Sequence, residues 1–106
     1  MPKYLLKASY TTQGVKGVAS EGGSSRRDAV KNAVESLGGS IEAFYFAFGD
    51  ADVYVISDLP DNQAATALAL ATNGSGAVTV QTVPLLTPED VDAAAKKSVQ
   101  YRAAGA

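Results

Sequence analysis

The sequence predicts an α+β domain whose strands and helices follow one another in the order βαββαβ, with one further helix at the end. Two observations predict it. Four segments alternate their side chains or are rich in β-branched and aromatic residues, which is typical of strands. Between them, apolar residues recur at helical spacing, with capping residues before and glycines after each run. At 106 residues the chain has the length of one domain, which we assign to residues 1–106.

The first predicted strand covers residues 2–10, and its tyrosines share one face with a leucine and an alanine. Thr11 and Thr12 then offer hydroxyl groups that cap a short turn or helix over residues 13–20. This segment is rich in glycine, so we expect it to be loosely held. Its glycines, and those just after it, are Gly14, Gly17, Gly22 and Gly23.

The helix with the clearest local signals follows Ser24 and Ser25, which can cap its first turn. The pair Gly38-Gly39 ends it. Its apolar stripe consists of Ala29, Val30, Ala33, Val34 and Leu37. The later predicted elements are strands over residues 41–48, 52–57 and 77–85, a helix over residues 63–72 and a terminal helix over residues 89–102.

This order of elements predicts a ferredoxin-like fold, in which helices cover one face of an antiparallel sheet. The second predicted strand is apolar on both faces. Its residues divide into Phe44, Phe46 and Phe48 on one face, and Ile41, Ala43, Tyr45 and Ala47 on the other. Because one layer of helices covers only one face, we expect a second copy to cover the other, in a homodimer of the dimeric α/β-barrel type. The alternative is that the C-terminal helix folds over that face.

The composition excludes several kinds of chemistry. The chain has neither cysteine nor histidine, which excludes disulfides, thiolate nucleophiles, zinc or haem held by these residues, and a Ser-His-Asp triad. We expect no metal and no cofactor. The net charge of −2 argues against a nucleic-acid partner. No apolar run approaches the roughly 20 residues that span a bilayer, and no signal peptide is recognisable, so we expect no membrane partner and a cytoplasmic location.

The turn from Gly49 to Asp52, with Tyr45 and Tyr54 on either side, is the candidate catalytic site. Asp52 would be a general base in apolar surroundings, and the two tyrosines would be hydrogen-bond donors. The alternative is a purely structural hairpin turn, in which Asp50 or Asp52 bonds its own backbone and Gly49 supplies a positive φ.

Arg26 and Arg27 stand at the start of a predicted helix, beside two glycines and two serines. Guanidinium groups, hydroxyls and free backbone amides together bind phosphate or carboxylate groups. We therefore predict Arg26, Arg27 and Gly49 as ligand-binding residues. No phosphate-loop lysine pattern or dinucleotide fingerprint is present, so a nucleotide is not indicated. The alternative is a capped, solvated first turn.

Short motifs spread over nearly the whole chain occur in a particular order. They are Pro2-Lys3-Tyr4, Thr11-Thr12-Gln13-Gly14, Ser25-Arg26-Arg27-Asp28-Ala29, Leu37-Gly38-Gly39, Tyr45, Gly49-Asp50-Ala51-Asp52, Asp58-Leu59-Pro60-Asp61 and Thr82. This order resembles the GYD-domain family of small bacterial proteins. In the motif that names the family, glycine and aspartate match Gly49 and Asp52, whereas Ala51 stands at the tyrosine position. The resemblance implies a ferredoxin-like fold and self-association, and it supplies no settled activity.

Three functional hypotheses follow. The first is a homo-oligomeric domain that binds a small apolar or anionic molecule. The second is a cofactor-free enzyme of the dimeric α/β-barrel kind, an isomerase, lyase or oxygenase, with Asp52 as base and Tyr45 and Tyr54 as donors. The third is a structural subunit that assembles into rings or filaments.

Overall fold

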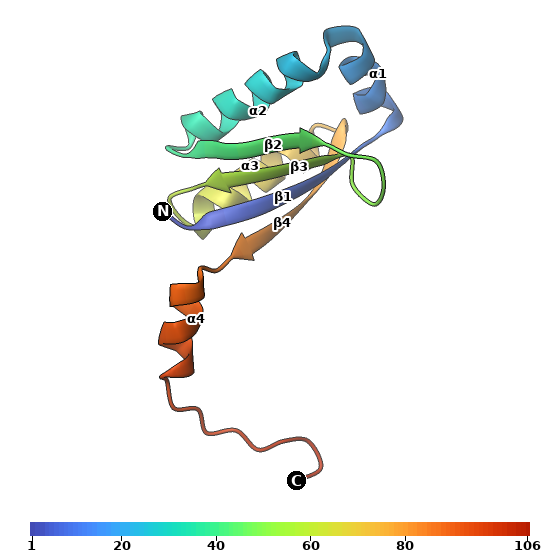
Figure 1. Ribbon diagram of the computed structural model, residues 1–106. Coiled ribbons are helices and arrows are strands. Elements are labelled where there is room, and N and C mark those ends of the chain that lie inside the picture. The colour runs from blue at the N-terminus through green and yellow to red at the C-terminus, as the bar shows by residue number, and fades with distance from the viewer.

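The computed structural model describes residues 1–106 and contains four strands and four helices (Figure 1). The strands are β1 (Lys3–Tyr10), β2 (Ser40–Phe46), β3 (Val53–Asp58) and β4 (Val78–Leu85). The helices are α1 (Thr12–Glu21), α2 (Gly23–Ser36), α3 (Asn62–Gly74) and α4 (Pro88–Ala95). The predicted order of strands and helices is confirmed, and the uncertain segment after β1 is a full helix.

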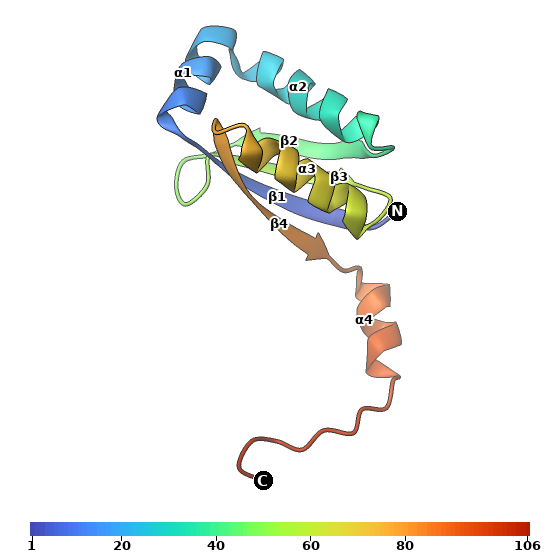
Figure 2. The ribbon, with the colours of Figure 1, turned by 180° about the vertical axis from the view of Figure 1, so that it is seen from behind.

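The strands form one antiparallel sheet in the order β2-β3-β1-β4, so that β1 and β3 are central and β2 and β4 are the edges. Helices α2 and α3 lie on the same face of this sheet (Figures 1 and 2). This is the ferredoxin-like arrangement that the sequence predicts. No element of the chain lies over the opposite face, which we call the open face.

The core lies between the sheet and helices α2 and α3. Alternation along β1 and β3 turns every second side chain of these two strands toward the helices. Removing their apolar area from water stabilises the fold by roughly 25 cal/mol per Å². The buried residues of the core are Tyr4, Leu6, Val34, Val53, Val55, Leu59, Ala65 and Leu68.

Strand β2 differs from the prediction in two ways. A bulge between Ile41 and Ala43 shifts the register, so Ile41 packs against the core instead of sharing the open face with Tyr45. The strand also ends at Phe46, and Phe48 lies in the following loop with its side chain fully exposed. A simple period of two cannot reveal a bulge, because one extra residue reverses the alternation of faces.

Helix α1 is anchored by a close approach at Gly14. The Thr11 hydroxyl accepts a hydrogen bond from the Gly14 N–H at 3.3 Å, and the Thr11 N–H donates to the Ala77 carbonyl at 3.0 Å. A Cβ atom added at Gly14 would overlap that same carbonyl and would lie 3.0 Å from the Tyr10 ring. Only glycine therefore allows α1 to approach the start of β4 so closely.

The terminal helix is shorter than predicted and projects away from the sheet (Figure 1). Its start is well specified, because the Thr87 hydroxyl accepts from the Asp90 N–H while the Asp90 carboxylate accepts from the Thr87 N–H, both at 3.0 Å. The helix ends at Ala95, whereas the sequence predicts residues 89–102. It does not fold over the open face of its own chain, so that alternative is wrong. None of the four helices is both long and apolar enough to cross a bilayer.

Two glycines of α1 test the close approach. Gly14→Ala is expected to lower the free energy of unfolding by about 2 kcal/mol or more, because the new methyl group meets rigid backbone. Gly17→Ala places its methyl group in open space, and alanine is the better helix former, so we expect a gain of about 0.5–1 kcal/mol. Chemical denaturation measures both changes. Two variants with the same stability would contradict the packing of α1.

Candidate functional site

The open face presents its side chains in rows that run across the strands, one of them apolar and the next a mixture of tyrosines and polar residues. Residues directly opposite one another in neighbouring strands share a face, so the register defines these rows. One row consists of Ala43, Ile56, Leu5 and Val83, and the next of Tyr45, Tyr54, Lys7 and Gln81. Tyr45 retains 72% of its accessible area and Val83 retains 39%. The predicted second apolar face of the sheet is thus present, although Ile41 does not belong to it.

One end of the open face carries a small ion-pair network. The Lys3 ammonium lies 3.0 Å from the Asp58 carboxylate and 3.3 Å from that of Glu42. The hydrogen bond to Asp58, and after it the one to Glu42, raises the pKa of Lys3 above its ordinary value of 10.5. These side chains are solvated, so the network adds little stability, but it links the bulged residue of β2 to the two central strands.

Asp52 ties the loop between β2 and β3 to the central strand. Its carboxylate accepts a hydrogen bond from the Tyr10 N–H at 2.8 Å. Its own N–H donates to the Ala8 carbonyl, and its carbonyl accepts from the Ala47 N–H, both at 2.8 Å. Asp52 therefore has a structural role in closing the loop. Tyr45 and Tyr54 lie directly opposite each other on the open face. The catalytic roles of these three residues stay predictions.

Asp52 also lines an apolar groove between α1 and the loop that follows β2. The groove has a volume of about 400 Å³, and Asp52 is the one charged residue in its wall. The other lining residues are Tyr10, Val15, Val18, Ala19, Phe46, Ala47 and Phe48. Sequence reasoning missed this groove, because it treated the glycine-rich segment as loose and placed Phe48 in a strand.

A small cavity lies between the sheet and helices α2 and α3. Its volume is about 50 Å³, and ten of its eleven lining residues are uncharged. The uncharged residues are Leu6, Ala8, Tyr10, Val30, Val53, Val55, Leu68, Thr72, Val78 and Val80. The eleventh is Arg26, whose Nε is buried and has no hydrogen-bond partner. Ser57 Oγ and Thr82 Oγ1 are also buried without a partner, but neither carries a charge.

The other two predicted ligand-binding residues do not line this cavity. The Arg27 side chain is 55% exposed and lies 3.4 Å from the carboxylate of its neighbour Asp28. Gly49 lies in the loop between β2 and β3 with a φ of 141°, and open space surrounds its Cβ position. The fold therefore separates Arg26 from both residues, and ligand binding by Arg27 and Gly49 stays a prediction.

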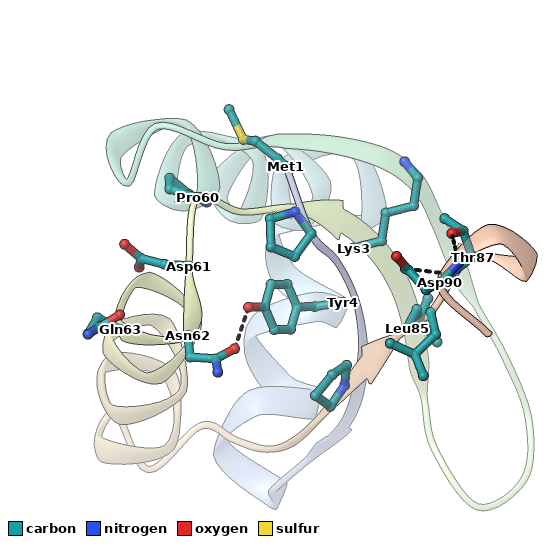
Figure 3. A pocket seen from close by; sticks show the side chains of 13 residues that line it. Met1, Lys3, Tyr4, Pro60, Asp61, Asn62, Gln63, Leu85, Thr87 and Asp90 are labelled. Carbon is teal, nitrogen blue, oxygen red and sulfur yellow. Dashed lines mark hydrogen bonds between the residues drawn. The ribbon is translucent and has the colours of Figure 1, made fainter. Parts of the chain in front are cut away.

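A wide groove lies where β1 begins and β4 ends (Figure 3). It has a volume of about 560 Å³. The Tyr4 hydroxyl points across it and donates to the Asn62 side-chain oxygen at 2.6 Å. Asp61 comes from the start of α3, and Thr87 and Asp90 from the start of α4. These segments are far apart in the sequence, so no local pattern signals the groove.

Comparison with protein-family models gives a match to the GYD domain over residues 4–95. The chain belongs to the GYD domain family. No curated protein matches it. In this GYD domain the matched region contains the open face, Asp52 and the Arg26 cavity, whereas residues 96–106 lie outside it. Ala51, at the position of the tyrosine in the naming motif, is a buried residue of the loop between β2 and β3.

The structural role of Asp52 is testable with a neighbouring control. Asp52→Ala removes the acceptor for the Tyr10 N–H and is expected to lower the free energy of unfolding by about 1–2 kcal/mol. Asp50→Ala is the control, because only the backbone oxygen of Asp50 accepts a hydrogen bond, from the Ser9 hydroxyl. Urea denaturation compares the two. If both variants were as stable as the unchanged domain, the Asp52 carboxylate would not hold the loop.

Proposed function

We propose that this GYD domain binds a small molecule with an apolar body and a carboxylate or similar anionic group, in the cavity under α2 and α3. The observation that carries the proposal is the buried, unpartnered Nε of Arg26 in an otherwise uncharged wall. A buried N–H of a charged group costs free energy until an acceptor reaches it. An anionic ligand supplies that acceptor, and arginine binds carboxylates through short, charge-assisted hydrogen bonds.

The cavity limits the size of the ligand. Its volume of about 50 Å³ is well below the roughly 150 Å³ of an engineered apolar cavity that holds benzene. A larger ligand therefore needs α2 to move away from the sheet. Glycines with positive φ flank this helix, Gly22 at 89° and Gly38 at 83°, and they are suitable hinge points. Short-chain carboxylates are accordingly the first class of ligand to test.

The same domain self-associates through the open face. An uncovered apolar sheet face is unusual in a protein that functions as a single copy. The row centred on Leu5 and Ile56 ends at Val83 and lies beside Tyr45, and these two side chains remain 39% and 72% exposed within one chain. A second copy related by twofold symmetry presents the same apolar row and is the simplest cover.

Ligand binding is tested by comparing two adjacent arginines. Arg26→Met keeps an unbranched apolar side chain over the core and removes the charge, so the affinity for short-chain carboxylates is expected to fall at least tenfold. That loss follows from about 1.5–3 kcal/mol for a hydrogen bond to a charged group. Arg27→Met is the matched control and is expected to bind as the unchanged domain does. Isothermal titration calorimetry measures the affinities, with the corresponding alcohols as uncharged ligands.

Two results would contradict the Arg26 site. The first is equal affinity for carboxylates and alcohols of the same chain length. The second is a loss of affinity in Arg27→Met as large as that in Arg26→Met. Absence of binding by the unchanged domain at millimolar carboxylate would also overturn the proposal.

Self-association is tested by placing a charge on either side of the sheet. Val83→Glu puts a carboxylate on the open face and is expected to raise the dimer dissociation constant at least tenfold. Leu70→Glu is the control, because Leu70 is 72% exposed on the helix side of the molecule. Sedimentation equilibrium at micromolar concentration measures the association. A monomeric unchanged domain, or equal effects of the two substitutions, would contradict this interface.

A further inference from the structure

The segment from residue 86 to residue 106, which we call the C-terminal arm, projects from the end of β4 away from the sheet (Figure 1). Every residue of the arm is exposed, including those of α4. Its larger apolar side chains are Leu86, Val91, Val99 and Tyr101, with exposed fractions of 72%, 55%, 79% and 80%. Apolar side chains of this size, clustered on one projecting segment, indicate a surface that another molecule covers.

The helix of the arm is too short to be stable by itself. Its reciprocal cap between Thr87 and Asp90 and the proline at position 88 specify where it begins. It has only eight residues, however, whereas isolated helices shorter than about 12–15 residues are marginal in water. Such a helix gains its stability from packing, and every one of its residues is exposed in the single chain.

The shape of the chain also indicates a missing neighbour. Its radius of gyration is 16.9 Å, and its extents are 56, 33 and 23 Å. A compact domain of this length has a radius of gyration of about 13 Å. The arm accounts for the excess, because it extends from the end of β4 away from the sheet (Figures 1 and 2). A projecting segment of this kind is typical of subunits that exchange an element with a partner.

The open face alone is small for a stable dimer. Four strands spaced about 4.8 Å apart, with about seven residues of 3.3 Å each, give a footprint of roughly 450 Å² per copy. Stable interfaces bury about 800 Å² per partner. A buried tyrosine covers about 150–250 Å², so Tyr101, Val91 and Val99 of each arm would supply much of the difference.

The charges of the arm permit this contact. It carries three acidic side chains, Glu89, Asp90 and Asp92, and three basic ones, Lys96, Lys97 and Arg102. The arm is therefore neutral in its side chains, and it meets no net repulsion from a second copy whose overall charge is −2.

We propose that the C-terminal arm of each copy packs on the second copy in the dimer, along the margin of the partner's open face, so that the two subunits exchange arms. This inference rests on the self-association proposed above. The occupants of the partner's surface are the exposed apolar side chains of the arm, with Val91, Val99 and Tyr101 as its anchors. The arm then accounts for the area that the two sheets do not supply.

The absence of cysteine makes a crosslinking test simple. A single cysteine is introduced by Val91→Cys or by Val99→Cys and labelled with benzophenone maleimide. The labelled chain is mixed with a ¹⁵N-labelled, unsubstituted chain, the subunits are allowed to exchange, and the sample is irradiated. Mass spectrometry is expected to find crosslinks from the arm to ¹⁵N peptides of β1 or β4. The control label, Lys31→Cys on the exposed surface of α2, is expected to give none.

A second measurement tests the contribution of the arm to affinity. Substitution of Val91, Val99 and Tyr101 by serine in the full chain leaves the core untouched, because these side chains are exposed. The dissociation constant from sedimentation equilibrium is expected to rise at least tenfold. Substitution of Lys96 and Lys97 by serine, in the same arm, is the control and is expected to have little effect.

The outcomes separate the two proposals. A dimer with crosslinks only within one chain, or with none from the arm, would overturn arm exchange and leave the sheet interface standing. A dimer whose dissociation constant is unchanged by the three serine substitutions would do the same. A monomeric unchanged domain at micromolar concentration would overturn both.

Discussion

The sheet of this GYD domain is apolar on both sides, while its own helices cover only one. On the covered side, α2 and α3 bury alternate residues of the central strands, with Leu6 and Val55 at the centre of the core. On the other side, Leu5 and Ile56 stand in the middle of a face that nothing in the chain covers. The last helix, which begins after the cap at Thr87, projects away from that face instead of over it. The proposed self-association and the proposed exchange of arms both rest on this unequal cover.

The covered side has its own irregularity at Arg26. Helix α2 packs mainly toward β2 and helix α3 toward β4, so the core is underfilled between them. Arg26 lines the resulting cavity, and its buried Nε has no hydrogen-bond acceptor. A structural arginine would be expected to pair there, as Lys3 does with Asp58 on the open face. The adjacent Arg27 has the same chemistry but stays in solvent, so position around the helix, rather than residue type, makes Arg26 the candidate.

Several features were predictable because they depend on neighbours in the sequence. Helix starts follow from side chains that bind the backbone a few residues on, as Asp61 and Thr87 do. The alternation in β1 placed Tyr4 and Leu6 in the core. The end of the last helix was not predictable in this way, since Lys96 and Lys97 are good helix formers, and the helix stops where no packing supports it. Arg26 was predicted to bind a ligand together with Arg27 and Gly49. In the structure, neither of those two residues lines the cavity beside Arg26.

By itself, the sequence determined the order of elements, the antiparallel sheet with helices on one face, and the presence of apolar residues on both faces. These properties arise from local capping and from periodicities of two and 3.6 residues. The tertiary structure alone decided the bulge that turns Ile41 inward, the hydrogen bond that makes Asp52 a structural residue, and the cavity beside Arg26. Each of these depends on contacts between segments distant in the chain, and no local pattern encodes the distance between two such segments.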